Sequence, residues 1–303
     1  MGDKVKVQED WLAVCSGCEI AVLDLHEAIL DVLQAIEFVR IPVLMDVKDF
    51  DQHTTVGILT GGIRNEENEH VAKKVRETSD IVVALGSCAA FGGIPGVNNI
   101  NSMPDIKQAV LTTTSTAPDQ QIPTSKELPK LFDTLRPISD VIKVDYFIPG
   151  CPPDSSVIAS VLTALLEGKE PQLGQKNVCD DCARERKEKR ITDIKRPIEA
   201  NGTPDECLLN QGFMCMGPAT RSGCGAQCPD VNAPCTGCYG PTAASYEQGA
   251  AMLNVVASAY GLDEDDSVDL EEMVKDVYDP VGTFYRYTMP ISMIKGKVTE
   301  SKR

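Results

Sequence analysis

Short apolar runs alternate with amphipathic stretches over the first half of the chain. Apolar runs typical of strands lie at residues 5–14, 42–47, 55–62, 81–87 and 146–150. Apolar residues at helical spacing predict a helix over 21–36, a charged run predicts another over 65–78, and Asp154 can cap a third. Strands that alternate with helices predict an α/β fold, a doubly wound parallel sheet with helices on both faces.

The stretch from Val97 to Pro137 interrupts this alternation. It holds five prolines, a TTTST run and few apolar clusters, so the pattern predicts a long loop. A loop of this length inside a domain is usually functional or covered by a partner, and a mobile insertion is the alternative. The sequence leaves both interpretations open.

The composition changes after Gly168, where helical periodicity fades and Cys, Gly and Pro become frequent. We therefore divide the chain into a sheet domain over 1–170 and an irregular C-terminal domain over 171–303. In the second domain, a mixed-charge run at 183–190 is typical of a solvated face, and a short helix is predicted over 245–260.

Two further segments of the C-terminal domain have a distinctive composition. An acidic tract covers residues 263–272, and the segment 282–294 carries much of the aromatic content of the chain. Because large apolar side chains favour protein contacts, the aromatic segment is a candidate for docking on a partner.

The charge of the chain excludes some partners. The 303 residues include 29 Lys and Arg against 45 Asp and Glu, a formal charge of −16. Nucleic acids and anionic membranes bind basic surfaces, so this balance argues against both. No apolar run approaches the roughly 18 residues of a membrane span, and the first residues do not read as an export signal. These features favour a cytoplasmic protein.

Cysteine is the unusual residue, with 12 copies against 3 histidines. Disulfides rarely persist in the reducing cytoplasm, so this number indicates metal binding. The cysteines divide into three sets of four, and four thiolates hold one cubane iron–sulfur cluster. The first set is Cys15, Cys18, Cys88 and Cys151, the second is Cys179, Cys182, Cys207 and Cys215, and the third is Cys224, Cys228, Cys235 and Cys238.

The first set follows the predicted strands. Its members come shortly after Val14, after Ser87 and after Pro149. Because the carboxyl ends of parallel strands meet at one edge of a sheet, we expect these thiolates to lie close together. Neighbouring glycines leave room for a bulky inorganic cluster, and Pro152 and Pro153 stiffen the last loop.

Zinc is the main alternative for the second and third sets. Tetrahedral zinc also takes four thiolates, and CxxC pairs are its usual signature. Zinc suits the first set less well, because its members are spread widely along the chain. For any single cysteine such as Cys88, a buried small hydrophobic residue is the simpler interpretation.

Other catalytic motifs are absent from the sequence. It contains no phosphate-binding P-loop, no nucleophile elbow and no HExxH zinc motif. His26, His53 and His70 are isolated, and we expect none of them to be a ligand. With every cysteine in a set, none remains as a nucleophile or a nickel ligand. The residues therefore favour an electron carrier that leaves bond chemistry to a partner.

The segments around the cysteines resemble those of nickel–iron hydrogenase small subunits. CSGC (15–18), GSCAAFGGIPG (86–96) and PGCPP (149–153) resemble the proximal-cluster motifs of that family. CLLNQGFMCMGPAT (207–220) and PCTGCYGPT (234–242) resemble its C-terminal cluster region. GGIRNEEN, GCGAQCP and GTFYRYTMP narrow the resemblance to the gamma subunits of the methyl-viologen-reducing, deazaflavin-non-reducing hydrogenases of methanogenic archaea.

This resemblance implies a fold, a set of ligands and partners. It implies a flavodoxin-like domain with a proximal cluster on the first set, then an irregular domain with a distal cluster on the second set. Cys224, Cys235 and Cys238 match the medial ligands. A large subunit would split dihydrogen at a nickel–iron site, and this chain would relay the electrons through three 4Fe–4S clusters. An iron–sulfur delta subunit would pass them to a flavin-containing heterodisulfide reductase complex.

Three positions depart from the family pattern. Cys179 stands where many uptake hydrogenases have His, and Cys228 adds a fourth thiolate where they hold a three-iron medial cluster. Both changes add negative charge, which lowers a cluster potential and suits low-potential acceptors. Glu19 directly follows Cys18, one position earlier than the family glutamate. It is either a group for proton exit or partner contact, or a carboxylate stabilised by a helix N-terminus.

Three other functions fit parts of the pattern. The small subunit of a deazaflavin-reducing hydrogenase has similar C-terminal motifs, but it passes electrons to a flavin subunit. A dihydrogen sensor uses the same architecture to signal to a kinase. A zinc-stapled adaptor without a redox role would be colourless, whereas cubane clusters are brown.

Overall fold

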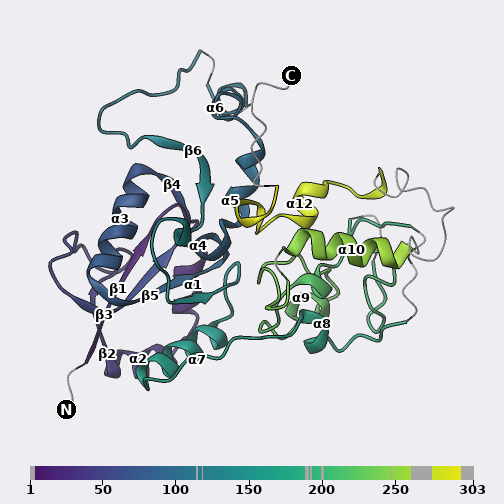
Figure 1. Ribbon diagram of the computed structural model, residues 1–303, viewed down its shortest axis with the longest axis horizontal. Coiled ribbons are helices and arrows are strands. Elements are labelled where there is room, and N and C mark those ends of the chain that lie inside the picture. Colours follow the sequence, from purple (N-terminus) through teal and green to yellow (C-terminus); the bar gives the residue numbers. More distant parts are fainter. Residues whose placement is uncertain are drawn as a thin grey trace.

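The computed structural model describes residues 4–113, 115–117, 119–187, 191, 193–198, 201–245, 247–260 and 275–294. A five-stranded sheet forms the N-terminal half (Figure 1), with strand order β2-β1-β3-β5-β7. All neighbouring strands run parallel. This order is the doubly wound, flavodoxin-like arrangement, so the predicted fold class is confirmed.

Four strands of this sheet match the apolar runs of the sequence. They are β1 (Val5–Trp11), β3 (Thr54–Thr60), β5 (Ser79–Leu85) and β7 (Tyr146–Ile148). β3 and β5 are buried along most of their length, as expected for strands covered on both faces.

Helices cover both faces of the sheet. On one face α1 (Gly17–Leu23), α2 (Ala28–Ala35) and α7 (Ser155–Leu166) pack on a core that includes Val56 and Val83. On the other, α3 (Glu66–Glu77) and α4 (Ser87–Phe91) pack on a core that includes Leu59 and Val82. The predicted helix starts are confirmed at two places. Asn65 caps α3 by accepting the Asn68 N–H, and Asp154 caps α7 by accepting the Ser156 N–H.

The region from 21 to 47 differs from the prediction. The single helix expected over 21–36 is broken, because residues 24–27 form a turn with His26 at a positive φ of 51°. One edge strand is β2 (Ile36–Arg40), which pairs with β1. The strand predicted at 42–47 is wrong: the chain turns there, with the Leu44 and Met45 N–H groups bonded to the Ile41 carbonyl. Because Ile36 falls at the helical spacing of the apolar residues before it, the sequence pattern did not indicate the strand that starts at this residue.

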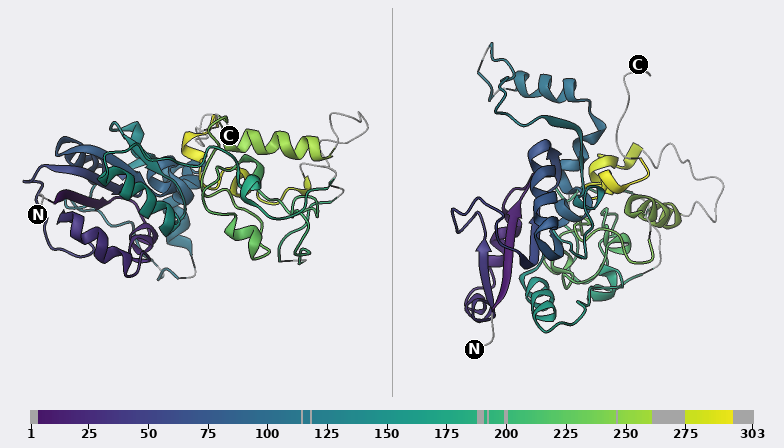
Figure 2. Two further views of the ribbon diagram at one scale, coloured as in Figure 1. Left: turned by 90° about the horizontal axis from the view of Figure 1, so that it is seen from below. Right: turned by 60° about the vertical axis from the view of Figure 1, so that its left-hand side comes forward.

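The loop predicted over 97–137 is wrong at both ends of this stretch, which contain regular structure, whereas residues 119–130 form turns and irregular backbone. The stretch holds η1 (Val97–Ile100), α6 (Met103–Thr112) and β6 (Leu131–Arg136), and a short helix α5 (Gly93–Gly96) precedes it. β6 pairs antiparallel with β4 (Ile63–Asn65). We call residues 97–137 the arm; it projects from the sheet domain beside α3 (Figure 2). A short η2 (Ile138–Asp140) follows it.

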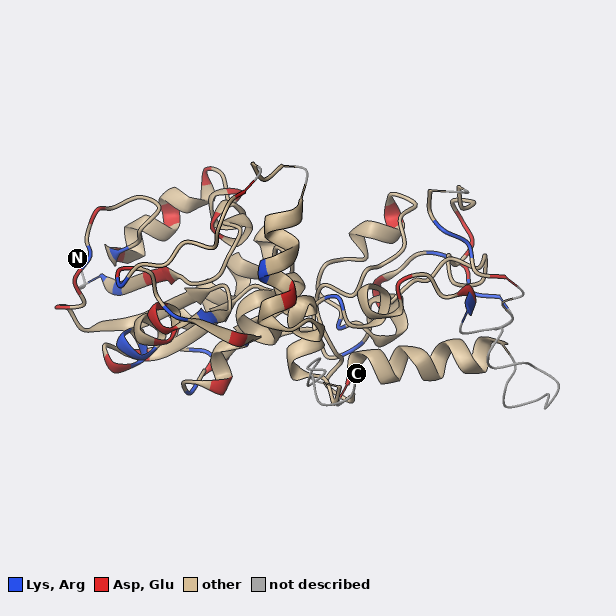
Figure 3. Ribbon diagram, turned by 90° about the horizontal axis from the view of Figure 1, so that it is seen from above, with Lys and Arg blue, Asp and Glu red and all other residues tan. Residues whose placement is uncertain are grey.

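The C-terminal half is built from short helices and loops. They are α8 (Val178–Asp181), η3 (Gly217–Ala219), α9 (Gln227–Asp230), α10 (Gln248–Tyr260), α12 (Pro280–Phe284) and η4 (Met289–Ile291). Their core includes Phe213, Met252 and Phe284. α10 confirms the helix predicted there and carries no charged residue (Figure 3). The irregular character of this half is thus confirmed, while the boundary at residue 170 stays a prediction.

Most of the aromatic segment 282–294 packs within the chain, whereas Met293 and Ile294 at its end are exposed, so its role in partner docking stays a prediction. Tyr287 and Met289 are buried, and the Tyr287 carbonyl accepts the Gly93 N–H at 3.1 Å. Pro290 lies so close to Gly92 and Gly96 that a Cβ there would meet its ring at 2.3 Å. The segment therefore joins the C-terminal half to the sheet domain.

Two other expectations concern charged segments and membranes. The acidic tract at 263–272 lies outside the described residues. In the run 183–190, the described residues 183, 185, 186 and 187 are exposed or half-buried, and Arg184 is half-buried with its guanidinium bonded to backbone carbonyls. Among the described helices, none is long and apolar enough to cross a bilayer.

Candidate iron–sulfur sites

The structure brings the first cysteine set together at the carboxyl edge of the sheet. Cys15 and Cys18 lie at the start of α1 after β1, Cys88 lies in α4 after β5, and Cys151 follows β7. Burial raises the pKa values of Cys18, Cys88 and Cys151, and other sulfurs of this set raise them further, as expected for close neighbours. The expected convergence of these strand ends therefore occurs, while the role of the four as ligands stays a prediction.

Glycines line the first set because side chains would not fit there. A Cβ at Gly86 would lie 2.3 Å from the Cys18 sulfur, and one at Gly93 would lie 2.4 Å from the Cys88 sulfur. Both glycines also have positive φ, at 89° and 60°. The glycine loop 92–96 thus packs against Cys88 through Gly93.

Ser87, which the sequence analysis missed, connects the loops of the first set. Its N–H donates to the Gly150 carbonyl at 2.8 Å, and its Oγ accepts the Gly150 N–H at 3.0 Å. The same hydroxyl donates to the Cys238 carbonyl of the C-terminal half. Ser87 is 1% exposed. It therefore fixes loops next to Cys88 and Cys151 relative to the third set.

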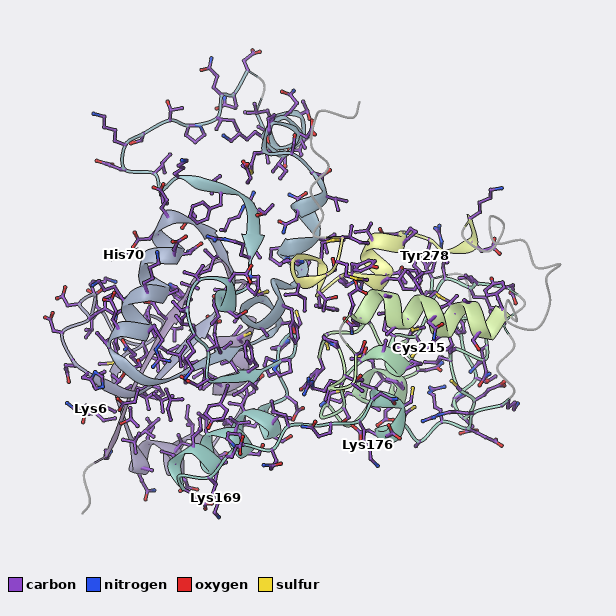
Figure 4. All side chains as sticks on the ribbon, in the orientation of Figure 1. Lys6, His70, Lys169, Lys176, Cys215 and Tyr278 are labelled. Atoms are coloured by element: carbon purple, nitrogen blue, oxygen red, sulfur yellow. The ribbon has the colours of Figure 1, made fainter. Side chains whose placement is uncertain are left out.

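Cys215 of the second set lies below α10 in the view of Figure 4. One cavity is lined by all its members together with Arg184, Arg186 and Gly217. A Cβ at Gly217 would lie 3.1 Å from the Cys179 sulfur. The four sulfurs of the second set therefore face one shared cavity.

The third set forms around the turn at α9. Cys228 lies in α9. Burial raises the pKa of its thiol, and the neighbouring Cys224 raises it further. Burial raises the pKa of Cys238, and the nearby Cys224 and Cys228 raise it further. Burial also raises the pKa of Cys235, with Cys215 of the second set and Cys238 as the nearby thiols. All the members of this set are therefore neighbours in space.

Contacts between the sets give them an order. The Cys151 N–H donates a hydrogen bond to the Cys238 sulfur, which joins the first set to the third. The Cys235 N–H donates to the Cys215 sulfur at 3.3 Å, which joins the third set to the second. The third set therefore lies between the other two.

The ionisation of the thiols shows what the sites require. Burial and neighbouring sulfurs raise the pKa of Cys88 and Cys179 to about 12, and burial raises that of Cys215 to about 11. Because metal binding needs thiolates, a strongly cationic group must offset this cost. Sets of four close thiols lined by glycine, with N–H donors to sulfur, fit an iron–sulfur cluster. Among the described residues, no group of three His, Cys, Asp or Glu side chains is close enough to hold a single metal ion.

Glu19 is buried beside the first set. It lies in the first turn of α1, where its Oε1 accepts a hydrogen bond from the Thr60 hydroxyl. Glu19 is 3% exposed, so its side chain does not reach a partner surface. Its place agrees with the helix N-terminal alternative. Nearby Glu9 is also buried, and burial together with the Glu19 and Asp10 carboxylates raises the pKa of Glu9 to about 8.

Arg184, the second residue that sequence reasoning missed, links the second and third sets. Its guanidinium donates to the carbonyls of Pro229 at 2.7 Å, Thr203 at 2.8 Å and Glu206 at 3.1 Å. Pro229 and Glu206 are the chain neighbours of Cys228 and Cys207. The position of Arg184 two residues after Cys182 was the available signal, but the mixed-charge run concealed it.

The chain is similar to components of known redox enzymes. The family described as NADH ubiquinone oxidoreductase, 20 Kd subunit, matches residues 15–165. A subunit of the F420-non-reducing hydrogenase of Methanothermobacter marburgensis is 42% identical over 303 residues, covering 98% of both chains. A subunit of the F420-non-reducing hydrogenase vhu of Methanocaldococcus jannaschii is 43% identical over 293 residues, covering 97% of this chain and 98% of the relative.

Solved structures show a similar fold. A chain of an NAD+-reducing [NiFe]-hydrogenase in the H2-reduced state aligns with a TM-score of 0.54 and 34% identity, covering 56% of this chain and 95% of that one. A chain of the Dm. baculatum [NiFeSe]-hydrogenase aligns with a TM-score of 0.51 over 80% of this chain and 97% of that one. Its 16% identity supports a likeness of fold alone.

Proposed function

Because the chain belongs to a family of F420-non-reducing hydrogenase subunits, we propose that it relays electrons from a nickel–iron large subunit through three 4Fe–4S clusters. It is a hydrogenase small subunit of the nickel–iron family, with a role in electron transfer. The cluster number and the acceptor are the parts that we propose.

The contact order of the cysteine sets carries the proposal. The first set is linked to the third through Cys151 and Cys238, and the third to the second through Cys235 and Cys215. The residues that would hold the clusters are the three sets of four cysteines, and bound clusters would supply one-electron carriers. N–H donors to the sulfurs of Cys238 and Cys215 stabilise the thiolate form.

We further propose that the acceptor lies beyond the second set and is an iron–sulfur subunit of a heterodisulfide reductase complex. The relatives are named F420-non-reducing hydrogenases, so the family membership supports an acceptor other than F420. A deazaflavin-reducing activity is accordingly not expected.

Metal analysis and electron paramagnetic resonance on anaerobically purified native material test the function. We expect about twelve iron and twelve sulfide per chain, after subtraction of the nickel–iron site, and three spin-coupled reduced clusters. About eleven iron would make Cys228 a non-ligand and the third site a three-iron cluster. About four iron with zinc would overturn the relay.

A further inference from the structure

The arm leaves an unfilled groove beside the first cysteine set. The groove runs between α6 and β6 and is lined by apolar side chains from both, including Ile106, Val110 and Leu131. α6 contains no buried residue, although it is a ten-residue helix. Leu128 and Val110 are 52% and 54% exposed. The apolar side of this helix is thus only partly covered by the described residues.

The base of the arm is fixed, so the groove has a defined shape. Buried Asn99 holds the backbone of Leu135 from both directions, donating to its carbonyl at 2.8 Å and accepting its N–H at 2.9 Å. Arg136 forms an ion pair with Glu69 of α3 at 2.8 Å. The Asn99 hydrogen bonds tie β6 to η1 at the base of the arm, and the Arg136 ion pair anchors β6 to the sheet domain.

The groove is basic although the chain is strongly acidic. Its charged lining residues are Arg64, Lys107, Lys130 and Asp133, on a chain with a formal charge of −16. Lys107 lies on α6 and Lys130 directly before β6, so the two ammonium groups flank the groove. Neither forms an ion pair with a described residue. The groove thus has apolar walls on two sides and two lysines that form no ion pair with a described residue. Such a surface fits a segment that carries both apolar side chains and carboxylates.

One end of the groove lies near the first cysteine set, although no cysteine lines it. Ala13 and Pro95 line its inner end. Ala13 lies two residues before Cys15, which is exposed, and Pro95 belongs to the glycine loop that packs on Cys88. A partner that delivers electrons to the first set must cover this surface, and the groove continues from it.

We propose that the arm groove docks an acidic, apolar-bearing segment of the hydrogenase large subunit and clamps it next to the first cysteine set. This proposal rests on the proposed function, because it takes the large subunit as the partner. The arm thereby enlarges the surface at which electrons enter the chain, and it orients the large subunit on that surface.

A charge-reversal experiment tests the proposal. Large-subunit affinity would be measured for the cluster-loaded chain with Lys107→Glu and Lys130→Glu together, over a series of salt concentrations. The matched control is Lys48→Glu with Lys169→Glu, which changes the charge equally at sites that are 74% and 71% exposed. Lys169 lies on the opposite side of the sheet domain from α6 (Figure 4).

We expect the groove variant to bind about tenfold more weakly at low salt, with a reduced salt dependence, while the control binds normally. A Val110→Asp variant should also weaken binding, and its iron content should stay that of the native chain. A photo-crosslinker at Val110 should capture a peptide of the large subunit.

Several outcomes would overturn the proposal. Native affinity of the groove variant, or equal weakening in the control, would remove the groove from the interface. Cross-linking to a second copy of this chain would assign the groove to self-association. By contrast, a native chain that lacks its clusters or does not bind a large subunit would overturn the proposed function itself.

Discussion

The backbone N–H of Cys151 donates a hydrogen bond to the sulfur of Cys238. The first residue follows the last strand of the sheet, and the second lies in the irregular C-terminal half. One contact therefore couples a loop of the first cysteine set to the third set. The position of each set depends on the docking of the two halves.

The first prediction concerns Ser87, whose hydroxyl bridges Gly150 and Cys238. Ser87→Ala would leave a buried N–H and a buried carbonyl without their partner. We expect a loss of about 1–3 kcal/mol in the free energy of unfolding. Thermal unfolding followed by the visible absorption of the clusters measures it. Ser160→Ala, which removes an exposed helical hydroxyl, should change little.

The second prediction concerns the space around the first set. Gly86→Ala would place a methyl group 2.3 Å from the Cys18 sulfur, at a φ of 89°. We expect this variant to lose about four iron per chain and to keep the other clusters. Gly168→Ala is the matched control, because its φ of 66° is also positive and a Cβ there meets nothing within 4 Å. Equal iron loss in the control would assign the effect to backbone strain.

The third prediction concerns the pH dependence that Glu9 contributes. Burial and nearby carboxylates raise the pKa of Glu9 from 4.5 to about 8. Between these two pH values the folded chain binds more protons than the unfolded chain, so stability falls as the pH rises. Above pH 8 this carboxylate is ionised in both states, and the penalty is complete.

Glu9→Gln removes this ionisation. Since each tenfold change in proton affinity corresponds to about 1.4 kcal/mol, the variant should be a few kcal/mol more stable than the native chain at pH 8–9. The difference should shrink toward pH 6. Unfolding midpoints of both proteins across this range provide the measurement, with exposed Glu170→Gln as the control. A difference that does not vary with pH would contradict the assignment to Glu9.

The fourth prediction concerns Arg184, which holds carbonyls beside Cys228 and Cys207. Arg184→Lys keeps the charge but cannot make the forked hydrogen bonds of a guanidinium. We expect it to lose iron from the second and third sites together, while the first site stays loaded. Iron analysis with electron paramagnetic resonance would show which signals disappear. Arg76→Lys, in the sheet domain, should keep all its iron.

Local sequence signals were sufficient for most of the sheet domain. The apolar runs at β3 and β5 match the strands because these strands are covered on both faces. Asn65 and Asp154 mark helix starts because their side chains cap the next turn directly. Such signals depend on neighbouring residues alone, so they can be read from the sequence.

The misassigned elements depend on distant partners. β2 forms at Ile36–Arg40 because it pairs with β1, and β6 forms because β4 lies beside it. Neither pairing is visible in the local pattern. The same reason explains the site residues that were missed, since Ser87 and Arg184 act on carbonyls far away in the sequence. The first cysteine set could be grouped because the ends of parallel strands converge. Cys207 and Cys215 have no local spacing signal, so their assignment to the second set depends on the resemblance to the family, and an exchange between Cys215 and Cys224 stays open.

Pro290 against Gly92 and Gly96 has a consequence for the order of biosynthesis. This contact closes a long loop, and it can form only after the segment 280–294 has left the ribosome. The sheet is built from strands that end by Ile148 and can assemble earlier. The loops that carry the first cysteine set would then remain accessible to the cellular machinery that delivers iron and sulfide. Arrival of the last helices would cover the loop beside Cys88 while Cys15 stays exposed, so translation narrows this window.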